Sequence, residues 1–119
     1  MFTVNVEHFG DMAVVECAGR IVKSDAAYRL RNAVIAEADA RIIILDFSEV
    51  EAIEGGGLGM LIYLQRWASD RYIRFKLFNP TRSVQERIDK ASVNDFDVAS
   101  LDEMTALLMA ADQHYAMAG

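Results

Sequence analysis

One stretch of the chain decides its fold: IIILDFSEVEAIEGGGLG, residues 42–59. It opens on Ile42–Leu45, a continuous apolar run without alternation, which is typical of a strand covered on both faces in a parallel sheet. A glycine tract follows between Gly55 and Gly59, and good helix formers then continue from Leu58 to Ala68. The order of buried strand, glycine turn and helix predicts a mixed α/β fold rather than a sandwich.

The residues on either side of this stretch fit the same architecture. Upstream, residues 2–7 alternate apolar and polar, and a turn at Gly10-Asp11 joins them to residues 12–18, which predicts a hairpin. Capping chemistry at Ser24-Asp25 and helical apolar spacing predict a helix of about four turns, ending at Ala38.

Downstream, residues 73–78 alternate apolar and basic side chains, which predicts a strand with one face toward water that ends at Asn79-Pro80. A short helix over residues 84–91 follows, then an extended piece. A capping box formed by Ser100 and Glu103 then predicts a last helix. No linker is long enough to divide the chain, so residues 1–119 are expected to form a single domain.

Composition excludes several classes of protein. Of the 119 residues, 53% are hydrophobic, which excludes a disordered chain. The one cysteine, Cys17, cannot form an intramolecular bridge, which favours a reducing compartment, and in a strand it should behave as a small hydrophobic residue. A net charge of −6 argues against nucleic-acid binding, and no apolar run is long enough to span a membrane. We therefore expect a soluble, cytoplasmic protein without a nucleic-acid or membrane partner.

Residues that could carry catalysis are scarce. His8 and His114 lie near opposite ends of the chain, and neither stands at metal-ligand spacing to another His or Cys. Glu49, Glu51 and Glu54 do not follow the pattern of a calcium-binding loop and are typical of a solvated connection. The sequence therefore predicts neither an enzyme nor a metal site, and no cofactor is expected.

The glycine tract has two interpretations. Glycines before a helix leave its first N–H groups uncovered, so the positive end of the helix could bind an anion or a nucleotide. Against this, the tract lacks the Gly-Lys-Ser/Thr ending of a P-loop and the spacing of a dinucleotide-binding fingerprint, and the preceding glutamates would repel phosphate. The other interpretation is a surface to which another backbone can come close.

The helix after the tract carries apolar residues on two sides. At about 100° per residue, one side holds Leu58, Leu61, Ile62, Gln65 and Ala68, and the other holds Met60, Tyr63, Leu64 and Trp67. Both sides cannot face the sheet. Methionine, tyrosine and tryptophan are typical of interface anchors, but packing inside the chain against residues 24–38 or 81–91 would explain this side equally well.

Residues 45–61, LDFSEVEAIEGGGLGML, resemble the signature segment of the STAS domain, the sulphate transporter and anti-sigma factor antagonist family. In that family a strand ending Leu-Asp-Leu-Ser is followed by a short turn and by Asp-Ser-Ser-Gly-Leu-Gly, which opens a helix. The likeness extends to the N-terminal strand pair, Gly19, Phe78-Asn79 and the C-terminal helix. It implies a STAS-like α/β fold with a mixed, mostly parallel sheet of about four to five strands and about four helices.

The resemblance also implies a function. Stand-alone members act as anti-sigma factor antagonists: a serine kinase that is also the anti-sigma factor phosphorylates the second serine of the motif, and the phosphate blocks binding. Matched residue by residue, Glu54 stands at the family's Asp, Gly55 at the first Ser and Gly56 at the phosphoacceptor, with Gly57, Leu58 and Gly59 at Gly-Leu-Gly. Gly56 has no hydroxyl, so the resemblance implies that the switch at this position is lost.

Two hypotheses of function follow. The first is a protein-binding regulatory module that docks a kinase-like anti-sigma factor or another signalling partner, without phosphorylation at the motif. Its docking residues are expected to be Glu54, Gly55, Gly56, Gly57, Leu58, Gly59, Met60, Tyr63 and Trp67. The second is a ligand-sensing STAS domain that binds an anion or a nucleotide at the glycine-rich helix N-terminus, with regulation through a hydroxyl such as Ser48, Thr81 or Ser83. A homodimer is compatible with both.

Overall fold

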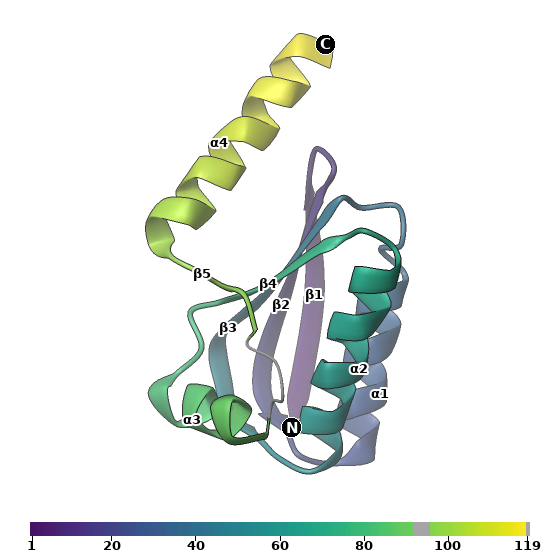
Figure 1. The fold of residues 1–119 in the computed structure, drawn as a ribbon, viewed down its shortest axis with the longest axis vertical. Helices are drawn as coiled ribbons and strands as arrows, with labels where there is room; N and C mark the ends of the chain where they lie inside the picture. The colour runs from purple at the N-terminus through teal and green to yellow at the C-terminus, as the bar shows by residue number, and fades with distance from the viewer. Residues whose placement is uncertain (92–95, 119) are drawn as a thin grey trace.

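The structure, a computed structural model, describes residues 1–91 and 96–118, with side chains as far as Ala111. Its elements follow one another as β1 (Phe2–Phe9), β2 (Met12–Ile21), α1 (Ser24–Ile35), β3 (Ile42–Ile53), α2 (Gly56–Asp70), β4 (Arg74–Phe78), α3 (Arg82–Ala91), β5 (Val98–Ala99) and α4 (Leu101–Ala118). The predicted α/β class and order of elements are confirmed (Figure 1). Within the described part of the chain, none of the helices is long and apolar enough to cross a bilayer.

The strands form one sheet in the order β1-β2-β3-β4-β5, which is also their order along the chain. β1 and β2 are an antiparallel hairpin, and each later strand is parallel to the one before it. Parallel neighbours need a crossover connection, and α1, α2 and α3 lie on these connections. β1 and β5 are therefore the two edges of the sheet.

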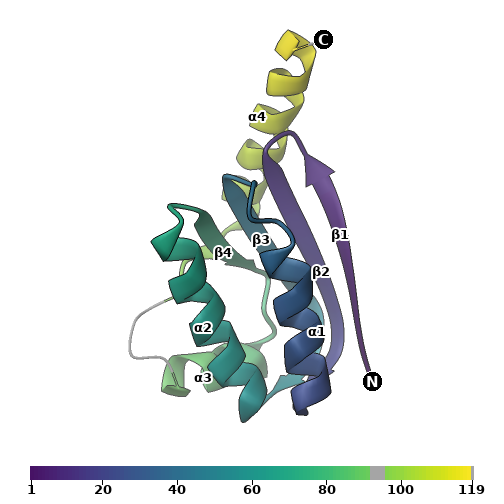
Figure 2. The same cartoon turned by 90° about the vertical axis from the view of Figure 1, so that its right-hand side faces the viewer.

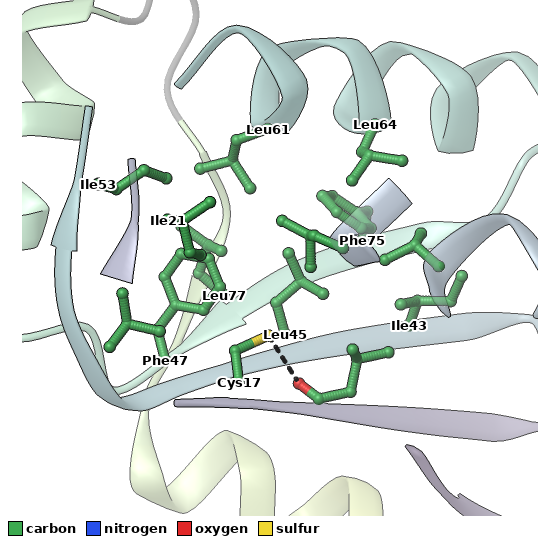
Figure 3. Packing of buried hydrophobic residues seen from close by; sticks show 14 of the residues in the cluster. Cys17, Ile21, Ile43, Leu45, Phe47, Ile53, Leu61, Leu64, Phe75 and Leu77 are labelled. Atoms are coloured by element: carbon green, nitrogen blue, oxygen red, sulfur yellow. Dashed lines mark hydrogen bonds between the residues drawn. The ribbon is translucent and has the colours of Figure 1, made fainter. Parts of the chain in front are cut away.

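The main core lies between the sheet and the pair α1 and α2, which cover one face side by side (Figure 2). Fully buried Ile43 and Leu45 of β3 point to this face, where Leu61 and Leu64 of α2 pack over them (Figure 3). Ile44 points to the opposite face. The apolar run at the start of β3 is thus buried on both sides, as its lack of alternation predicts.

The opposite face is covered in part by the first turns of α4. Met104 of α4 packs there against Met12, Val14 and Ile44, and α4 then extends away from the sheet (Figure 1). Ser100 caps this helix as predicted, because its Oγ accepts a hydrogen bond from the N–H of Glu103 at 3.0 Å.

Lys76 of β4 corrects the prediction that the basic face of residues 73–78 lies in water. It is 3% exposed, and its Nζ donates to Asp97 at 2.5 Å and to Glu103 at 2.8 Å. Burial by itself would lower the pKa of Lys76, but the hydrogen bonds and charges of these carboxylates outweigh it and raise the pKa. The side chain of Lys76 therefore anchors the start of α4 to the sheet.

Several predicted boundaries also move. β3 continues to Ile53 because β2 runs beside it as far as the pair Ile21↔Ile53. α1 ends at Ile35 rather than Ala38, and its N-cap is Lys23, without a side-chain cap bond, so Ser24 and Asp25 lie inside the first turn. α2 begins at Gly56 rather than Leu58.

Candidate functional site

The connection from β3 to α2 is a turn fixed by hydrogen bonds to its neighbours. The N–H of Glu54 donates to the carbonyl of Ile21 at 3.1 Å, which holds the end of β3 against the end of β2. Gly57 N–H then donates back to Glu54 O at 3.0 Å, and Gly59 N–H donates to Gly55 O at 3.2 Å. These bonds start α2 inside the glycine tract, at the carboxyl ends of two parallel strands.

Two glycines of the tract are required by the fold. Gly55, the N-cap of α2, has φ 52° and ψ −118°, a conformation that residues with a side chain rarely adopt. Gly57 is buried, and a Cβ on it would lie 2.2 Å from the carbonyl oxygen of Ile21. The turn thus needs glycine at 55 for its backbone angles and at 57 for close packing.

Gly56 and Gly59 have no such reason to be glycine. Both are exposed residues of α2, and a Cβ built on either meets nothing within 4 Å. Glycine in a helix costs roughly 0.5–1 kcal/mol relative to alanine, so these positions carry a cost that packing inside the chain does not offset. They leave a bare strip of backbone on the outer side of the first turns of α2.

The outer side of α2 continues from this strip to Ile62 and Tyr63, which are 38% and 51% exposed. Leu58 and Met60 flank it, half-buried against the main core. We call the exposed set Gly56, Gly59, Ile62 and Tyr63 the α2 surface. The sequence grouped Ile62 on one side of the helix with Leu61 and Ala68, but these two are buried whereas Ile62 is exposed.

Trp67 does not belong to the α2 surface. It is 8% exposed within the main core, and the Arg71 guanidinium lies 4.9 Å from its ring centroid. Leu64, predicted on the same side, is fully buried. Of the two explanations for the Met/Tyr/Trp side, packing inside the chain holds for these two residues, because α1 packs beside α2 and covers more of the helix than the sheet alone would cover. Trp67 is therefore removed from the expected docking residues.

Glu54 links the glycine turn to α3. Its carboxylate forms an ion pair with Arg87 at 2.6 Å, with both side chains about half exposed. Glu54 and Arg87 also line a shallow hollow of about 340 Å³, together with Ser83 and Lys90. Arg87 was missing from the predicted site, because it lies 33 residues beyond Glu54 and no local pattern connects them.

The other polar residues named from the sequence lie apart from the α2 surface or are engaged elsewhere. Ser48 Oγ donates to Asp46 at 2.5 Å and accepts from Asn79 at 3.2 Å, and Thr81 accepts from the N–H of Val84 at the start of α3. His8 contacts Glu37 near the far end of β1. The side chain of His114 lies outside the described residues. Among those described, no group of His, Cys, Asp and Glu has the arrangement of a metal site.

Cys17 is a buried core residue, as predicted. The residue is 3% exposed, and its thiol donates to the carbonyl oxygen of Val15 at 3.7 Å, a contact drawn in Figure 3. Burial, with a smaller contribution from the charge of Asp46, raises the pKa of Cys17 to about 12. The thiol is therefore protonated at neutral pH and poorly reactive.

The family model of the STAS domain matches residues 3–106, which is most of the chain. The chain belongs to the STAS domain family. This family assignment and the α/β fold agree with the predicted resemblance. Comparison with curated proteins finds no significant match.

Solved structures share this fold, and two of the three compared below are described as anti-sigma factor antagonists. The unphosphorylated form of SpoIIAA is 16% identical, with a TM-score of 0.71, over 92% of this chain and 97% of that one. A serine-to-glutamate variant of RsbS from Moorella thermoacetica is 15% identical, with a TM-score of 0.72 and the same two coverages. An anti-sigma factor antagonist from Mycobacterium paratuberculosis is 20% identical, with a TM-score of 0.68, over 92% and 95% of the two chains.

Proposed function

We propose that this STAS domain is a protein-binding regulatory module of the anti-sigma factor antagonist kind. Its docking surface consists of the glycine turn, Glu54 to Gly57, and the α2 surface. The observation that carries the proposal is the open space at Gly56 and Gly59. These glycines serve no packing purpose inside the chain, and they let a partner's backbone approach α2 directly.

The partner that fits this proposal is an anti-sigma factor of the serine kinase type or a related signalling protein. Support comes from the family and from the shared fold of structures described as anti-sigma factor antagonists. Ile62 and Tyr63 supply exposed apolar and aromatic contacts, which protein interfaces favour at their centres. Trp67 is omitted because it is buried.

In this proposal the docking surface is not switched by phosphorylation at its centre. One of the similar structures is described as the phosphorylated form of SpoIIAA, so phosphorylation occurs in this fold. The resemblance assigns the phosphoacceptor position to Gly56, which has no hydroxyl. Partner binding would then be controlled by the abundance of the two proteins or by competition.

The alternative, an anion or nucleotide site at the start of α2, has less support. Glu54 lies at the turn itself, and Arg87, the cation that contacts it, is already ion-paired. A phosphate there would approach the carboxylates of Glu51 and Glu54, which repel it. Absence of thermal stabilisation by millimolar nucleotide would remove this alternative.

Single substitutions on the docking surface test the docking proposal. Wild-type chain and the variants Gly56→Asp and Tyr63→Asp are immobilised and exposed to candidate anti-sigma factor kinases from the native host. We expect one of them to bind the wild type and neither variant, while Arg31→Glu on α1, the control, binds normally. Gly56→Ser should take up phosphate from that kinase with ATP, whereas the wild type takes up none in residues 54–59. Equal binding by the wild type and Gly56→Asp would refute the docking surface.

A further inference from the structure

The outer edge of β1 is the longer of the two edges of the sheet. β1 has eight residues, whereas β5, at the other edge, has two. Proteins usually protect a long edge with proline, lysine, a bulge or a covering segment. β1 contains no proline or lysine, and it pairs from Phe2↔Gly19 to Phe9↔Met12 without a bulge. Figure 2 shows it at the border of the sheet, with α1 beside it.

The backbone of Val4 and Val6 faces outward from this edge. The N–H of Arg20 donates to Met1 O at 3.0 Å, so Met1 and Arg20 form a hydrogen-bonded pair that continues the β1–β2 ladder. Bonded pairs alternate along an antiparallel ladder, and the even-numbered residues of β1 therefore turn their N–H and C=O groups away from β2. Arg29 caps the first of these residues, since its Nη1 donates to Phe2 O at 2.5 Å.

Beside the edge, α1 and the turn after it carry opposite charges at the two ends of β1. Arg29 lies near the start of β1, with its guanidinium 5.7 Å from the centroid of the Phe2 ring. Glu37 lies near the end of β1, where its carboxylate contacts the ring of His8. Half-buried Ala33 stands midway, and the four-residue spacing places these residues along one side of the helix and its continuation.

We propose that a second copy of this chain pairs with this edge, β1 antiparallel to β1, about a two-fold axis at Asn5. Val4 then pairs with Val6 of the partner subunit, so outward-facing backbone groups meet and β-branched side chains lie opposite each other. Thr3 lies opposite Glu7 of the partner subunit, so no like charges face each other in the ladder.

The charges beside β1 specify the same axis. Because Arg29 and Glu37 lie at opposite ends of the strand, antiparallel pairing brings Arg29 of each copy toward Glu37 of the partner subunit. The Glu37 side chain is 15% exposed, beside His8. A two-fold interface must be self-complementary, and a cation, a small residue and an anion in a row satisfy this condition. An axis moved to Val4 or Val6 would pair fewer residues and separate Arg29 from Glu37 of the partner subunit.

This dimer goes beyond the proposed docking function and does not depend on it. The interface uses β1 and one side of α1, whereas the docking surface uses the glycine turn and the α2 surface. Both copies in the dimer keep their docking surfaces. The paired sheets would run continuously through both copies, and Val4 and Val6, which are half-buried in one chain, would be covered further.

Charge exchange tests the dimer directly. Light scattering and sedimentation of the full chain over a concentration series should show a species of twice 13.3 kDa. Arg29→Glu and Glu37→Arg should each weaken self-association by about tenfold or more, because like charges then meet across the interface. An equimolar mixture of the two variants should restore dimers, since both ion pairs are then attractive. Arg31→Glu, the same charge change on another side of α1, should dimerise like the wild type.

Two further measurements address the strand pairing. Val6→Pro removes an outward N–H without touching the β1–β2 ladder, and it should abolish dimers while leaving the monomer folded. In the wild type, the amide protons of Val4 and Val6 should become more protected from hydrogen exchange as concentration rises. This last test needs no variant, so it stands even where a substitution prevents folding. A chain that stays at 13.3 kDa up to millimolar concentration overturns the proposal, as does a mixture that forms no dimers.

Discussion

Gly57 lies so close to Ile21 that a Cβ on the glycine would be 2.2 Å from the carbonyl oxygen of Ile21 and 2.8 Å from its Cγ2. The carbonyl belongs to backbone at the end of β2, which also accepts the N–H of Glu54. Neither the end of β2 nor the glycine turn can therefore move aside without breaking that hydrogen bond. This contact fixes the start of α2 over the ends of β2 and β3, and it leaves Gly56 and Gly59 facing outward.

Alanine substitutions in the tract should separate the glycines required by the fold from those that are not. Gly57→Ala should lower the free energy of unfolding by about 3 kcal/mol, because the extra methyl overpacks the turn. Gly59→Ala should raise it by about 0.5 kcal/mol through better helix propensity, and Gly56→Ala should leave it unchanged or slightly raised. Urea denaturation of the purified variants provides the comparison. Equal stability of Gly57→Ala and Gly56→Ala would contradict the close packing.

Glu16 should make stability depend on pH. A hydrogen bond with Glu7, then burial, then the charges of Glu7 and Asp46 raise the pKa of Glu16 above its ordinary value of 4.5. A carboxyl whose pKa is raised by folding stabilises the native state below the unfolded pKa, and this contribution is lost as pH rises through the folded pKa. Glu16→Gln should therefore raise the melting temperature at pH 7, and the gain should disappear when the pH falls below 4.5.

A matched variant separates this local effect from net charge. Glu51→Gln removes the same charge at an exposed position of β3, the strand beside β2, where it should leave the melting temperature nearly unchanged. If both variants stabilise the protein equally at pH 7, the interaction of Glu16 with Glu7 and Asp46 is not the cause.

Cys17 should be unreactive in the native protein and should destabilise it in alkali. Folding raises the pKa of the thiol from 9.0 to about 12, so the protonated native form is favoured. The associated stability is present below pH 9.0 and is lost as pH rises toward 12. Iodoacetamide should label Cys17 no faster than the chain unfolds. Between pH 9.0 and 12 the free energy of unfolding should fall faster for the wild type than for Cys17→Ala. If the two proteins lose stability in parallel over this range, the assigned pKa is contradicted.

Lys76→Met should loosen α4 from the sheet. The substitution keeps the buried stem but leaves Asp97 and Glu103 without their shared cation. We expect the free energy of unfolding to fall by about 2 kcal/mol, the scale of hydrogen bonds to a charged group. Amide exchange in the first turns of α4 should increase more than exchange in β3. Arg74→Met, at an exposed position of the same strand, is the control and should change neither quantity.

The parts of the fold that follow from short-range chemistry could be predicted from the sequence. The apolar run at Ile42–Leu45, the glycine turn and the capping of α4 by Ser100 each depend on residues within a few positions of one another. Their patterns therefore identify strand, turn and helix directly. The family resemblance rests on the same segment, so it too follows from the sequence alone.

Features that depend on distant residues could not be predicted in this way. Lys76 is buried because Asp97 and Glu103, 21 and 27 residues further on, lie over it. Trp67 is covered because the neighbouring helix and the sheet together enclose most of α2, which a helical wheel does not show. The different requirements of Gly55, Gly56, Gly57 and Gly59 are likewise invisible in a run of identical letters, because they depend on backbone angles and on where Ile21 lies.

The strands lie in the sheet in the same order in which the ribosome makes them. Each strand is added beside the one made before it, so no later strand has to enter between two that are already paired. As the chain leaves the ribosome, the newest edge is always the one that the next strand covers. The edge formed by the first strand is never covered in this way, so from the completion of the hairpin onward no later strand of the same chain protects it.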